Sequence, residues 1–306
     1  MLKNEFNSLA ELTDFFKDEE TCRKYLAEKR WGNKPYCPCC GCQKVYCFSD
    51  GKRYKCSSCR KQFTVRAGSI FEDSKVPLRK WFITLYLIAT HKKGISSHQL
   101  ARDRGVTQKT AWYMLSKIRF ALDESNIESQ LSDTVELDET FVGGKNKNRH
   151  WDKKVPHSQG RSFKDKTPVF GMLQRGGKVI AKVVPDTKAK TLNPLIKQYI
   201  AKGSTICTDD WYYGNLSKDY NHLQVDHSAK VYAIGNNYTN TIEGFWSQLK
   251  RSILGIYHVT SRKHLQKYVN EMCFRYNYRK LKQGERVNKM LSLCWNRITY
   301  KELVYE

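Results

Sequence analysis

The chain has 306 residues, which is long enough for two or three domains of ordinary size. Its 54 lysines and arginines against 30 acidic residues give a formal net charge of +24, which exceeds what solubility requires and predicts a polyanionic partner. The longest apolar run, Trp81 to Ala89, is too short to span a membrane, and the start of the chain lacks the apolar segment of a secretion signal. We therefore expect nucleic acid rather than lipid as the partner, and the cytoplasm rather than export as the location.

The first two segments are expected to be helical and then β-rich. Residues 1–34 predict a helical lead-in, because apolar residues recur at helical spacing within Leu9–Phe16. Residues 35–66 predict a small module in which Asp50 and Gly51 form a turn between two short strands.

The cysteines of this module are spaced for a metal. Eight of the eleven cysteines lie between Cys22 and Cys59, which indicates a local metal site in a reducing compartment rather than disulfides. Two C-x2-C pairs separated by fifteen residues have the spacing of a tetrahedral, structural Zn²⁺ site with four thiolate ligands: Cys37, Cys40, Cys56 and Cys59. A register that uses Cys39 and Cys42 stays open, although Gly41 favours the first register because the chain must reverse directly after the second ligand.

Residues 76–122 predict three helices, the last two of which span Ser96–Arg104 and Thr107–Phe120. Gly105 at the break gives the short turn of a helix-turn-helix DNA-binding domain. The exposed first turns of the last helix would present five residues to a DNA groove: Gln108, Lys109, Thr110, Tyr113 and Lys117. An ordinary three-helix packing unit is the alternative.

The rest of the chain predicts an α/β domain. The polar stretch 123–133 is expected to be a linker, 134–285 to be the α/β domain and 286–306 to be a C-terminal tail. Four runs have strand character: Thr134–Val142, Pro168–Gln174, Lys178–Val184 and Thr205–Thr208. Three runs have helix character: Asn193–Lys202, Thr241–Leu254 and His264–Tyr276. Strands and helices mixed in this order predict a mixed sheet.

Acidic residues in apolar segments stand out in this basic chain. Asp138 lies in the predicted strand TVELDETFV, where alternation places Glu136 and Asp138 on the face opposite Glu139. Asp138 is therefore preferred to Glu139 as a metal ligand. Asp209 follows another predicted strand, at an end where ligands often collect, and its neighbour Asp210 stays an alternative.

The helix predicted from Thr241 carries the third acid. Glu243, Ser247 and Lys250 stack on one ridge beside its apolar stripe, and Glu243 and Lys250 are about 10 Å apart at Cα. Three acids from separate elements can hold two divalent cations, which activate a water or a 3′-hydroxyl and stabilise the leaving oxygen of a phosphodiester. Three unrelated surface acids are the alternative.

Several segments resemble a known family over nearly the whole chain: VELDETFVGGK (Val135–Lys145), TPVFGMLQRGGKV (Thr167–Val179), TDDW (Thr208–Trp211), Thr239–Arg279, and the flanks CRKYLAEKRW and YKCSSCRKQFTVRAGSIFEDSKVPLRKWF of the cysteines. The chain resembles insertion-sequence transposases of the DDE class that carry an amino-terminal zinc ribbon, the bacterial relatives of Merlin elements. Asp210 and the additional cysteines depart from the family pattern: Cys39, Cys42 and Cys47.

The resemblance implies an RNase H-like catalytic domain in which Asp138, Asp209 and Glu243 are the catalytic acids and Lys250 is an accessory residue. It also implies that the enzyme uses Mg²⁺ to hydrolyse the transposon ends and to join the freed 3′-hydroxyls to target DNA. Each active site would hold two Mg²⁺ ions, and Mn²⁺ could replace them.

We therefore expect a multidomain DNA transposase: a small zinc ribbon, an all-α helix-turn-helix and an α/β RNase H-like domain with a mixed sheet. Double-stranded DNA is the expected partner, and a homodimer or higher oligomer is expected because two transposon ends must be handled together. Basic residues after the first catalytic strand and on the Glu243 helix are expected to contact DNA: Lys145, Lys147, Arg149, Lys250 and Arg251. The rival functions are a non-catalytic DNA-binding regulator and a structure-specific nuclease.

Overall fold

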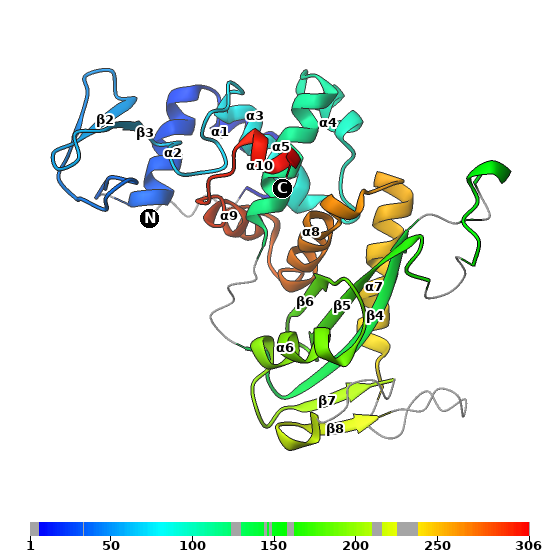
Figure 1. The fold of residues 1–306 in the computed structure, drawn as a ribbon. Helices are drawn as coiled ribbons and strands as arrows, with labels where there is room; N and C mark the ends of the chain where they lie inside the picture. Colours follow the sequence, from blue (N-terminus) through cyan, green and yellow to red (C-terminus); the bar gives the residue numbers. More distant parts are fainter. Residues whose placement is uncertain are drawn as a thin grey trace. The chain divides into compact units, whose positions relative to one another are not determined.

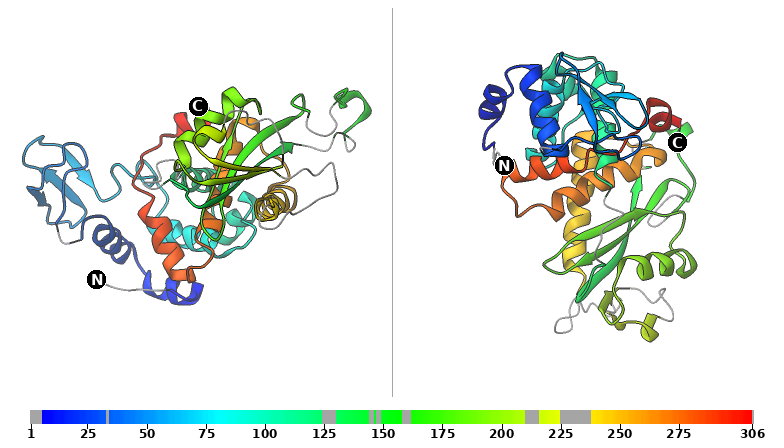
Figure 2. Two further views of the ribbon diagram at one scale, coloured as in Figure 1. Left: turned by 90° about the horizontal axis from the view of Figure 1, so that it is seen from below. Right: turned by 90° about the vertical axis from the view of Figure 1, so that its left-hand side faces the viewer.

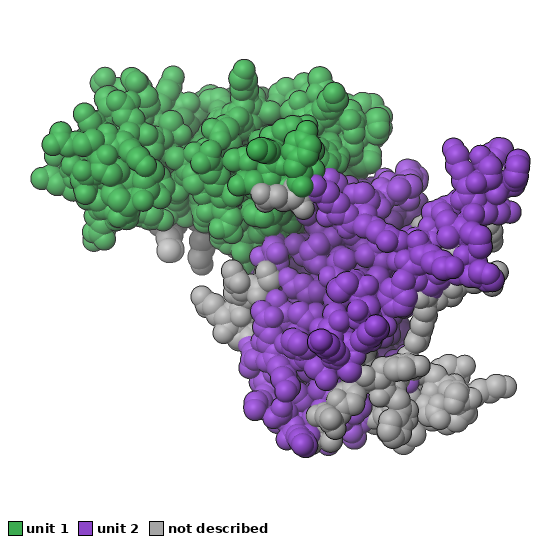
Figure 3. Space-filling view, in the orientation of Figure 1, with its two compact units in different colours: residues 1–122, 280–306 green, residues 123–279 purple. Residues whose placement is uncertain are grey.

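The computed structural model describes the chain except for residues 1–5, 33, 124–129, 144–145, 147–148, 158–161, 210–215, 225–237 and 306. The chain folds into two units, which Figure 3 colours separately. Unit 1 contains residues 1–122 and 280–306, and unit 2 contains residues 123–279. Within the described part of the chain, every helix is too short or too polar to cross a membrane.

Unit 1 combines helices with one small sheet (Figure 1). The helices are α1 (Leu9–Phe15), α2 (Glu19–Trp31), α3 (Leu78–Thr90), α4 (Ser97–Arg104), α5 (Gln108–Ala121), α9 (Gln283–Ser292) and α10 (Tyr300–Tyr305). The antiparallel sheet has the order β1 (Val45–Cys47), β2 (Arg53–Cys56), β3 (Gln62–Thr64). The sequence predicted the hairpin but not its third strand.

Helix α3 forms the centre of unit 1. Its sequence LRKWFITLYLIAT is apolar on nearly every side, and all but its few polar or terminal residues are buried. A helix that is apolar all round must be covered by other elements. Helices α1, α2, α4, α5 and α9 provide that cover.

Helices α4 and α5 are joined by the short turn that the sequence predicted. Gly105 ends α4 with φ of +58°, in the left-handed region that favours glycine. Thr107 then caps α5, because its hydroxyl accepts the backbone N–H of Thr110 at 3.2 Å. Ala111, Met114, Leu115 and Ile118 of α5 are buried in unit 1.

The end of the chain differs from the expected tail. Residues 280–306 belong to unit 1 and contain α9 and α10. Arg286 in α9 donates to the carbonyl of Ala89 at 2.9 Å, and Tyr86 in α3 donates to the side chain of Gln283 at 2.9 Å. These contacts join α9 to α3, so the segment is part of the core of unit 1 and not an appendage.

Unit 2 is built on a five-stranded mixed sheet of order β6-β5-β4-β7-β8. The strands are β4 (Thr134–Gly143), β5 (Lys166–Gln174), β6 (Val179–Val183), β7 (Thr205–Thr208) and β8 (Asn221–Gln224). Strand β5 is antiparallel to both of its neighbours, β4 and β6, whereas β7 is parallel to β4 and β8 is parallel to β7. The mixed sheet that the sequence predicted is confirmed.

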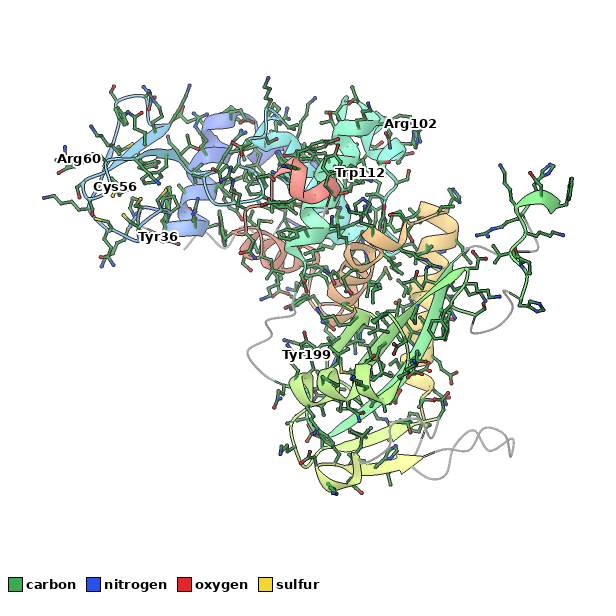
Figure 4. All side chains as sticks on the ribbon, in the orientation of Figure 1. Tyr36, Cys56, Arg60, Arg102, Trp112 and Tyr199 are labelled. Carbon is green, nitrogen blue, oxygen red and sulfur yellow. The ribbon has the colours of Figure 1, made fainter. Side chains whose placement is uncertain are left out.

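Helices cover both faces of this sheet. Helix α6 (Ala189–Tyr199) packs on one face, against a cluster that includes Val135 and Leu137 of β4. Helices α7 (Asn240–Ser252) and α8 (Leu265–Asn277) pack on the other face. The two further views in Figure 2 show the sheet between these helices. Figure 4 labels Tyr199 at the end of α6. Because the odd-numbered residues Val135 and Leu137 pack against α6, the even-numbered β4 residues point towards α7.

One buried carboxylate fixes the start of α7. Glu136 is 0% exposed and accepts the backbone N–H of Ile242 at 2.9 Å and the hydroxyl of Thr241 at 3.0 Å. Thr239, at the N-cap position of α7, makes no capping hydrogen bond with its side chain. Glu136 thus serves as the cap from a neighbouring strand, and its negative charge complements the positive end of the helix dipole.

Arg175 neutralises Glu136. Its Nε donates to Glu136 Oε1 at 2.7 Å, and a terminal nitrogen donates to the carbonyl of Tyr238 at 2.6 Å. The guanidinium also lies 3.6 Å from the centroid of the Tyr238 ring. A buried charge is tolerated only when it is paired and hydrogen-bonded, and Glu136 satisfies both conditions.

We predict that Glu136→Gln destabilises unit 2 by on the order of 3 kcal/mol, because Arg175 loses its charged partner in a largely buried position. Urea-induced unfolding at pH 7 measures this change. Asp219→Asn is the matched control, since it breaks an exposed ion pair with Lys202 at 3.0 Å and is expected to cost less than about 1 kcal/mol. Equal effects of the two substitutions would contradict the role given to Glu136.

Candidate active site and zinc centre

The four expected cysteines of unit 1 meet in space. The Sγ atoms of Cys37, Cys40, Cys56 and Cys59 all lie within 4.8 Å of one another. Cys37 and Cys59 are 3.6 Å apart, as are Cys40 and Cys56. A tetrahedron with Zn–S bonds of about 2.3 Å has edges of about 3.8 Å, so the group fits a structural zinc ion. Figure 4 labels Cys56 in this ribbon.

The turn around the first C-x2-C pair shows why Cys37 and Cys40, and not Cys39 and Cys42, are the ligands. The backbone N–H of Cys39 lies 3.4 Å from the Sγ of Cys37, and Gly41 reverses the chain with φ of +74°. The Sγ of Cys42 instead lies 3.7 Å from the hydroxyl of Ser57, outside the four-sulfur group. Cys39 and Cys47 are exposed. The geometry therefore selects Cys37 and Cys40.

We predict that Cys59→Ser removes zinc from the purified protein and unfolds residues 35–66, because strands of three or four residues cannot hold the ribbon without the metal. Zinc content by elemental analysis and limited proteolysis measure these effects. Cys47→Ser is the control and is expected to keep one zinc ion per chain. Loss of zinc from Cys47→Ser, or its retention in Cys59→Ser, would overturn the assignment.

In unit 2, Asp138 lies in the middle of β4 on the face covered by α7. Its Oδ1 accepts the backbone N–H of Glu139 at 2.7 Å, and its Oδ2 accepts the indole N–H of Trp246 at 2.9 Å. Burial of the carboxyl group, followed by the charges of Asp209 and Glu139, raises the pKa of Asp138 to about 8. The site therefore disfavours the ionised carboxylate unless a cation is present.

Asp209 directly follows β7, the parallel neighbour of β4. Ile206 packs on the α6 side, so alternation places Cys207 and Asp209 on the same face as Asp138. In the parallel register Glu136 pairs with Cys207, so Asp209, two residues beyond Cys207, follows on beside Asp138. Asp210, the alternative ligand, lies outside the described residues.

The third acid is less tightly placed. Glu243 is exposed in the first turn of α7, and its Oε1 accepts the hydroxyl of Thr239 at 3.4 Å. Lys250 and Arg251 are exposed in the last turn of α7. Among the described residues, the four cysteines are the only set of three or more possible ligand side chains that meet. The structure thus brings Asp138 and Asp209 together and leaves the Glu243 carboxylate outside a closed group.

Sequence reasoning missed three contributors to this site. Glu136 and Arg175 anchor α7, and the indole N–H of Trp246 reaches Asp138. Alternation in β4 did place Glu136 on the same face as Asp138, which was the available signal. The sequence offered no signal for the partners Arg175 and Trp246, because both contacts depend on how distant segments pack.

We predict that the metal-free protein loses stability as the pH rises from about 4 to about 8. The pKa of Asp138 is raised from 3.8 to about 8, so the folded state holds a proton that the unfolded state releases in this range. Asp138→Asn removes this contribution. The unfolding free energy of the variant relative to the native chain should therefore be higher at pH 8 than at pH 5, as measured by urea denaturation in EDTA. A difference that does not change with pH would contradict the prediction.

The residues of α5 that were expected to contact DNA differ in how exposed they are. Lys109 is exposed, and Gln108 is half-buried with its amide donating to the hydroxyl of Ser97 at 2.8 Å. Thr110 and Tyr113 are half-buried, and the Tyr113 ring lies 5.9 Å from the ring of Tyr300. Figure 4 labels Trp112 on this helix.

Lys117 does not lie on the surface where the sequence placed it. It is 1% exposed, its Nζ donates to the carbonyl of Glu72 at 3.1 Å, and the ammonium lies 4.9 Å from the centroid of the Tyr113 ring. Burial lowers its pKa to about 8. Helical spacing alone did not reveal this position, because Glu72 comes from a loop distant in sequence. Lys117 is a buried structural residue.

The connection between β4 and β5 contains the expected basic stretch. Lys145 and Lys147 lie outside the described residues. Arg149 forms an ion pair with Asp165, and the side chain of Asn146 exchanges two hydrogen bonds with the backbone of Val155, at 2.8 and 2.9 Å. Residues 151–154 are exposed, and they include Lys153, Lys154 and Trp151, which is 80% exposed.

Two family models match the chain. A transposase zinc-ribbon domain matches residues 17–62, and an ISXO2-like transposase domain matches residues 130–277. The first match contains all four cysteines of the ribbon, and the second contains Asp138, Asp209, Glu243 and Lys250.

Individual proteins are similar as well. The crystal structure of the Mos1 strand transfer complex aligns at 14% identity over 74% of this chain and 82% of that chain, with a TM-score of 0.29, too low to define a fold. A protein in transposable element ISH50 of Halobacterium salinarum is 29% identical over 77% of this chain and 83% of its own length. A transposase-like protein of Haemophilus influenzae is 30% identical over 37% of this chain and 93% of its own length. The chain therefore belongs to the insertion-sequence transposase family that joins a transposase zinc ribbon to an ISXO2-like transposase domain.

Proposed function

We propose that this transposase is a Mg²⁺-dependent DDE enzyme that binds the terminal inverted repeats of its element, cleaves the DNA at the 3′ ends and joins those ends to target DNA. It rests mainly on the β4–β7 register, which brings Asp138 and Asp209 next to each other on the sheet face covered by α7, the helix that carries Glu243.

The donor set fits magnesium. Carboxylate oxygens are hard ligands of the kind that Mg²⁺ prefers, and Asp138, Asp209 and Glu243 supply them from three separate elements. Two neighbouring carboxylates that repel each other are stabilised when a cation lies between them. Bound magnesium would supply Lewis-acid activation of the attacking oxygen and stabilisation of the leaving oxygen.

The side chains of α7 have distinct proposed roles. The long hydrogen bond of 3.4 Å from Thr239 leaves the exposed Glu243 carboxylate able to turn towards the two aspartates and complete the metal site. Lys250, seven residues further along α7, is placed to hold a phosphate of the bound DNA. Arg251 is exposed next to it and adds positive charge.

We further propose that unit 1 reads the transposon ends. Helices α4 and α5 would act as a helix-turn-helix in which Gln108 and Lys109 reach the DNA groove. Positive side chains also line a cavity of about 310 Å³ between α2 and the ribbon turn, namely Arg23, Lys24 and Lys52. The charge of +24 supports a DNA partner for the whole chain.

The β4–β5 connection is proposed to approach the same DNA through its exposed residues Lys153 and Lys154. Lys145 and Lys147 are further candidates. Arg149 already pairs with Asp165 and is expected to position the connection more than to contact a phosphate. We propose a homodimer or higher oligomer on DNA, because strand transfer of an element requires both of its ends together.

We predict that Asp138→Asn lowers the rate of Mg²⁺-dependent nicking of a terminal-repeat duplex by about 10³-fold or more, since a lost metal ligand removes several kcal/mol of transition-state stabilisation. Affinity for the duplex, measured in EDTA, should stay within about threefold of the native value. Asp219→Asn is the control and should nick normally, because Asp219 precedes β8 at the end of the sheet opposite Asp209 and pairs with Lys202.

The same experiment separates the rival functions. A non-catalytic regulator would bind the repeat but show no nicking even as the native chain. A structure-specific nuclease would cut branched DNA regardless of terminal sequence and would not join ends to a target. Normal nicking by Asp138→Asn would exclude the proposed active site.

A further inference from the structure

Both oxygens of the Asp138 carboxylate are held by N–H donors. The backbone N–H of Glu139 fixes Oδ1 at 2.7 Å, and the indole N–H of Trp246 fixes Oδ2 at 2.9 Å. The first donor is available to any residue at this position of the strand. The second requires a tryptophan on α7, so it is specific to this chain's packing.

The indole ring of Trp246 is held in one place by its neighbours. Trp246 is 4% exposed and belongs to the core cluster between the sheet, α7 and α8. Its ring lies 5.1 Å from that of Phe245, which in turn meets the ring of Tyr276 edge-on at 5.7 Å. A buried ring that is closely surrounded by other side chains has few alternative rotamers. The packing of the core therefore sets the direction of the indole N–H.

Gly171 provides the space for this ring. It is the direct β5 partner of Asp138, and a Cβ atom built on it would lie 2.5 and 2.6 Å from two carbons of the Trp246 ring. It would also lie 2.9 Å from Ile242 Cδ1. The φ of Gly171 is not in the left-handed region, so the glycine is required by close approach and not by backbone conformation.

The two acids of β4 therefore hold α7 at two successive points. Glu136 accepts the backbone N–H of Ile242, and Asp138 accepts the indole N–H of Trp246, one turn further along the helix. Glu243 lies between these points, three residues before Trp246 and on a neighbouring part of the helix surface. The contact that orients Asp138 thus also fixes the helix that carries the third acid.

We infer that Trp246 is a positioning residue for the proposed catalytic site, that it presets the Asp138 carboxylate for a divalent cation, and that Gly171 is needed to admit its ring. This inference rests on the proposed function. Hydrogen-bonding partners that orient metal ligands typically change metal affinity or activity by about 10- to 100-fold when they are removed.

The test compares Mn²⁺ binding to the DNA-free protein by electron paramagnetic resonance with Mg²⁺-dependent nicking and with melting temperature. Trp246→Phe keeps a buried aromatic ring and removes the N–H, so it should weaken Mn²⁺ binding at least about tenfold. Ile196→Val in α6 is the control, because it disturbs the core of the same unit on the face of the sheet opposite Asp138. It should lower the melting temperature but leave Mn²⁺ affinity within about twofold.

A double-mutant cycle makes the result specific. Once Asp138 is replaced by Asn, adding Trp246→Phe should cause no further loss of Mn²⁺ binding or nicking, because the side chain that it orients is already altered. Gly171→Ala provides a second route, since it keeps the N–H but displaces the ring. It should also weaken Mn²⁺ binding by about tenfold, with the melting temperature showing that the variant is folded.

The inference is overturned if Trp246→Phe and Gly171→Ala both bind Mn²⁺ and nick DNA as the native chain does while Asp138→Asn abolishes nicking. That pattern would leave the proposed function intact and reduce Trp246 to a packing residue. Equal losses in Trp246→Phe and Ile196→Val would overturn it in the same way. Normal nicking by Asp138→Asn would instead remove the proposed function itself.

Discussion

The ion pair between Glu136 and Arg175 connects the strand and the helix on which the proposed chemistry depends. Helix α7 has no capping side chain at its own N-cap, so its first turn is fixed by a carboxylate from β4. Since Asp138 follows two residues later on the same face of that strand, the sheet sets both the first acid and the helix of the third. The position of Glu243 relative to Asp138 is therefore a consequence of one buried, neutralised charge.

This arrangement has an electrostatic cost that fits its proposed use. The burial that lets Trp246 reach Asp138 also raises the pKa of that acid, and the nearby charge of Asp209 adds to the effect. A site that is unfavourable for ionised carboxylates without a cation gains affinity for one. The zinc ribbon uses metal differently, because its four thiolates leave no open position and the ion replaces a hydrophobic core that the short strands cannot form.

Much of this fold was predictable because its signals are local. The spacing of the four cysteines, the turn at Gly105, and the bounds of Thr205–Thr208 needed only neighbouring residues. The elements that were missed depend on distant partners. Strand β8 has the polar sequence NHLQ and forms only by pairing with β7, and α9 packs on α3 almost 200 residues away in sequence. Lys117 has helical spacing typical of a surface residue, yet it is buried against Glu72. The same holds for the candidate site: alternation in β4, a local signal, selected Asp138, whereas the hydrogen bond from Trp246 depends on a distant segment and could not be predicted.

In the proposed mechanism, Asp138, Asp209 and Glu243 together hold divalent cations once DNA is bound. The most direct measurement is anomalous X-ray scattering from Mn²⁺ in crystals of the transposase with a terminal-repeat duplex. Two peaks about 3.5 to 4 Å apart are expected, with Asp138 between them and Glu243 turned towards the pair. Mn²⁺ peaks that lie away from Asp138, or a Glu243 carboxylate that stays directed to solvent beside an occupied site, would contradict it.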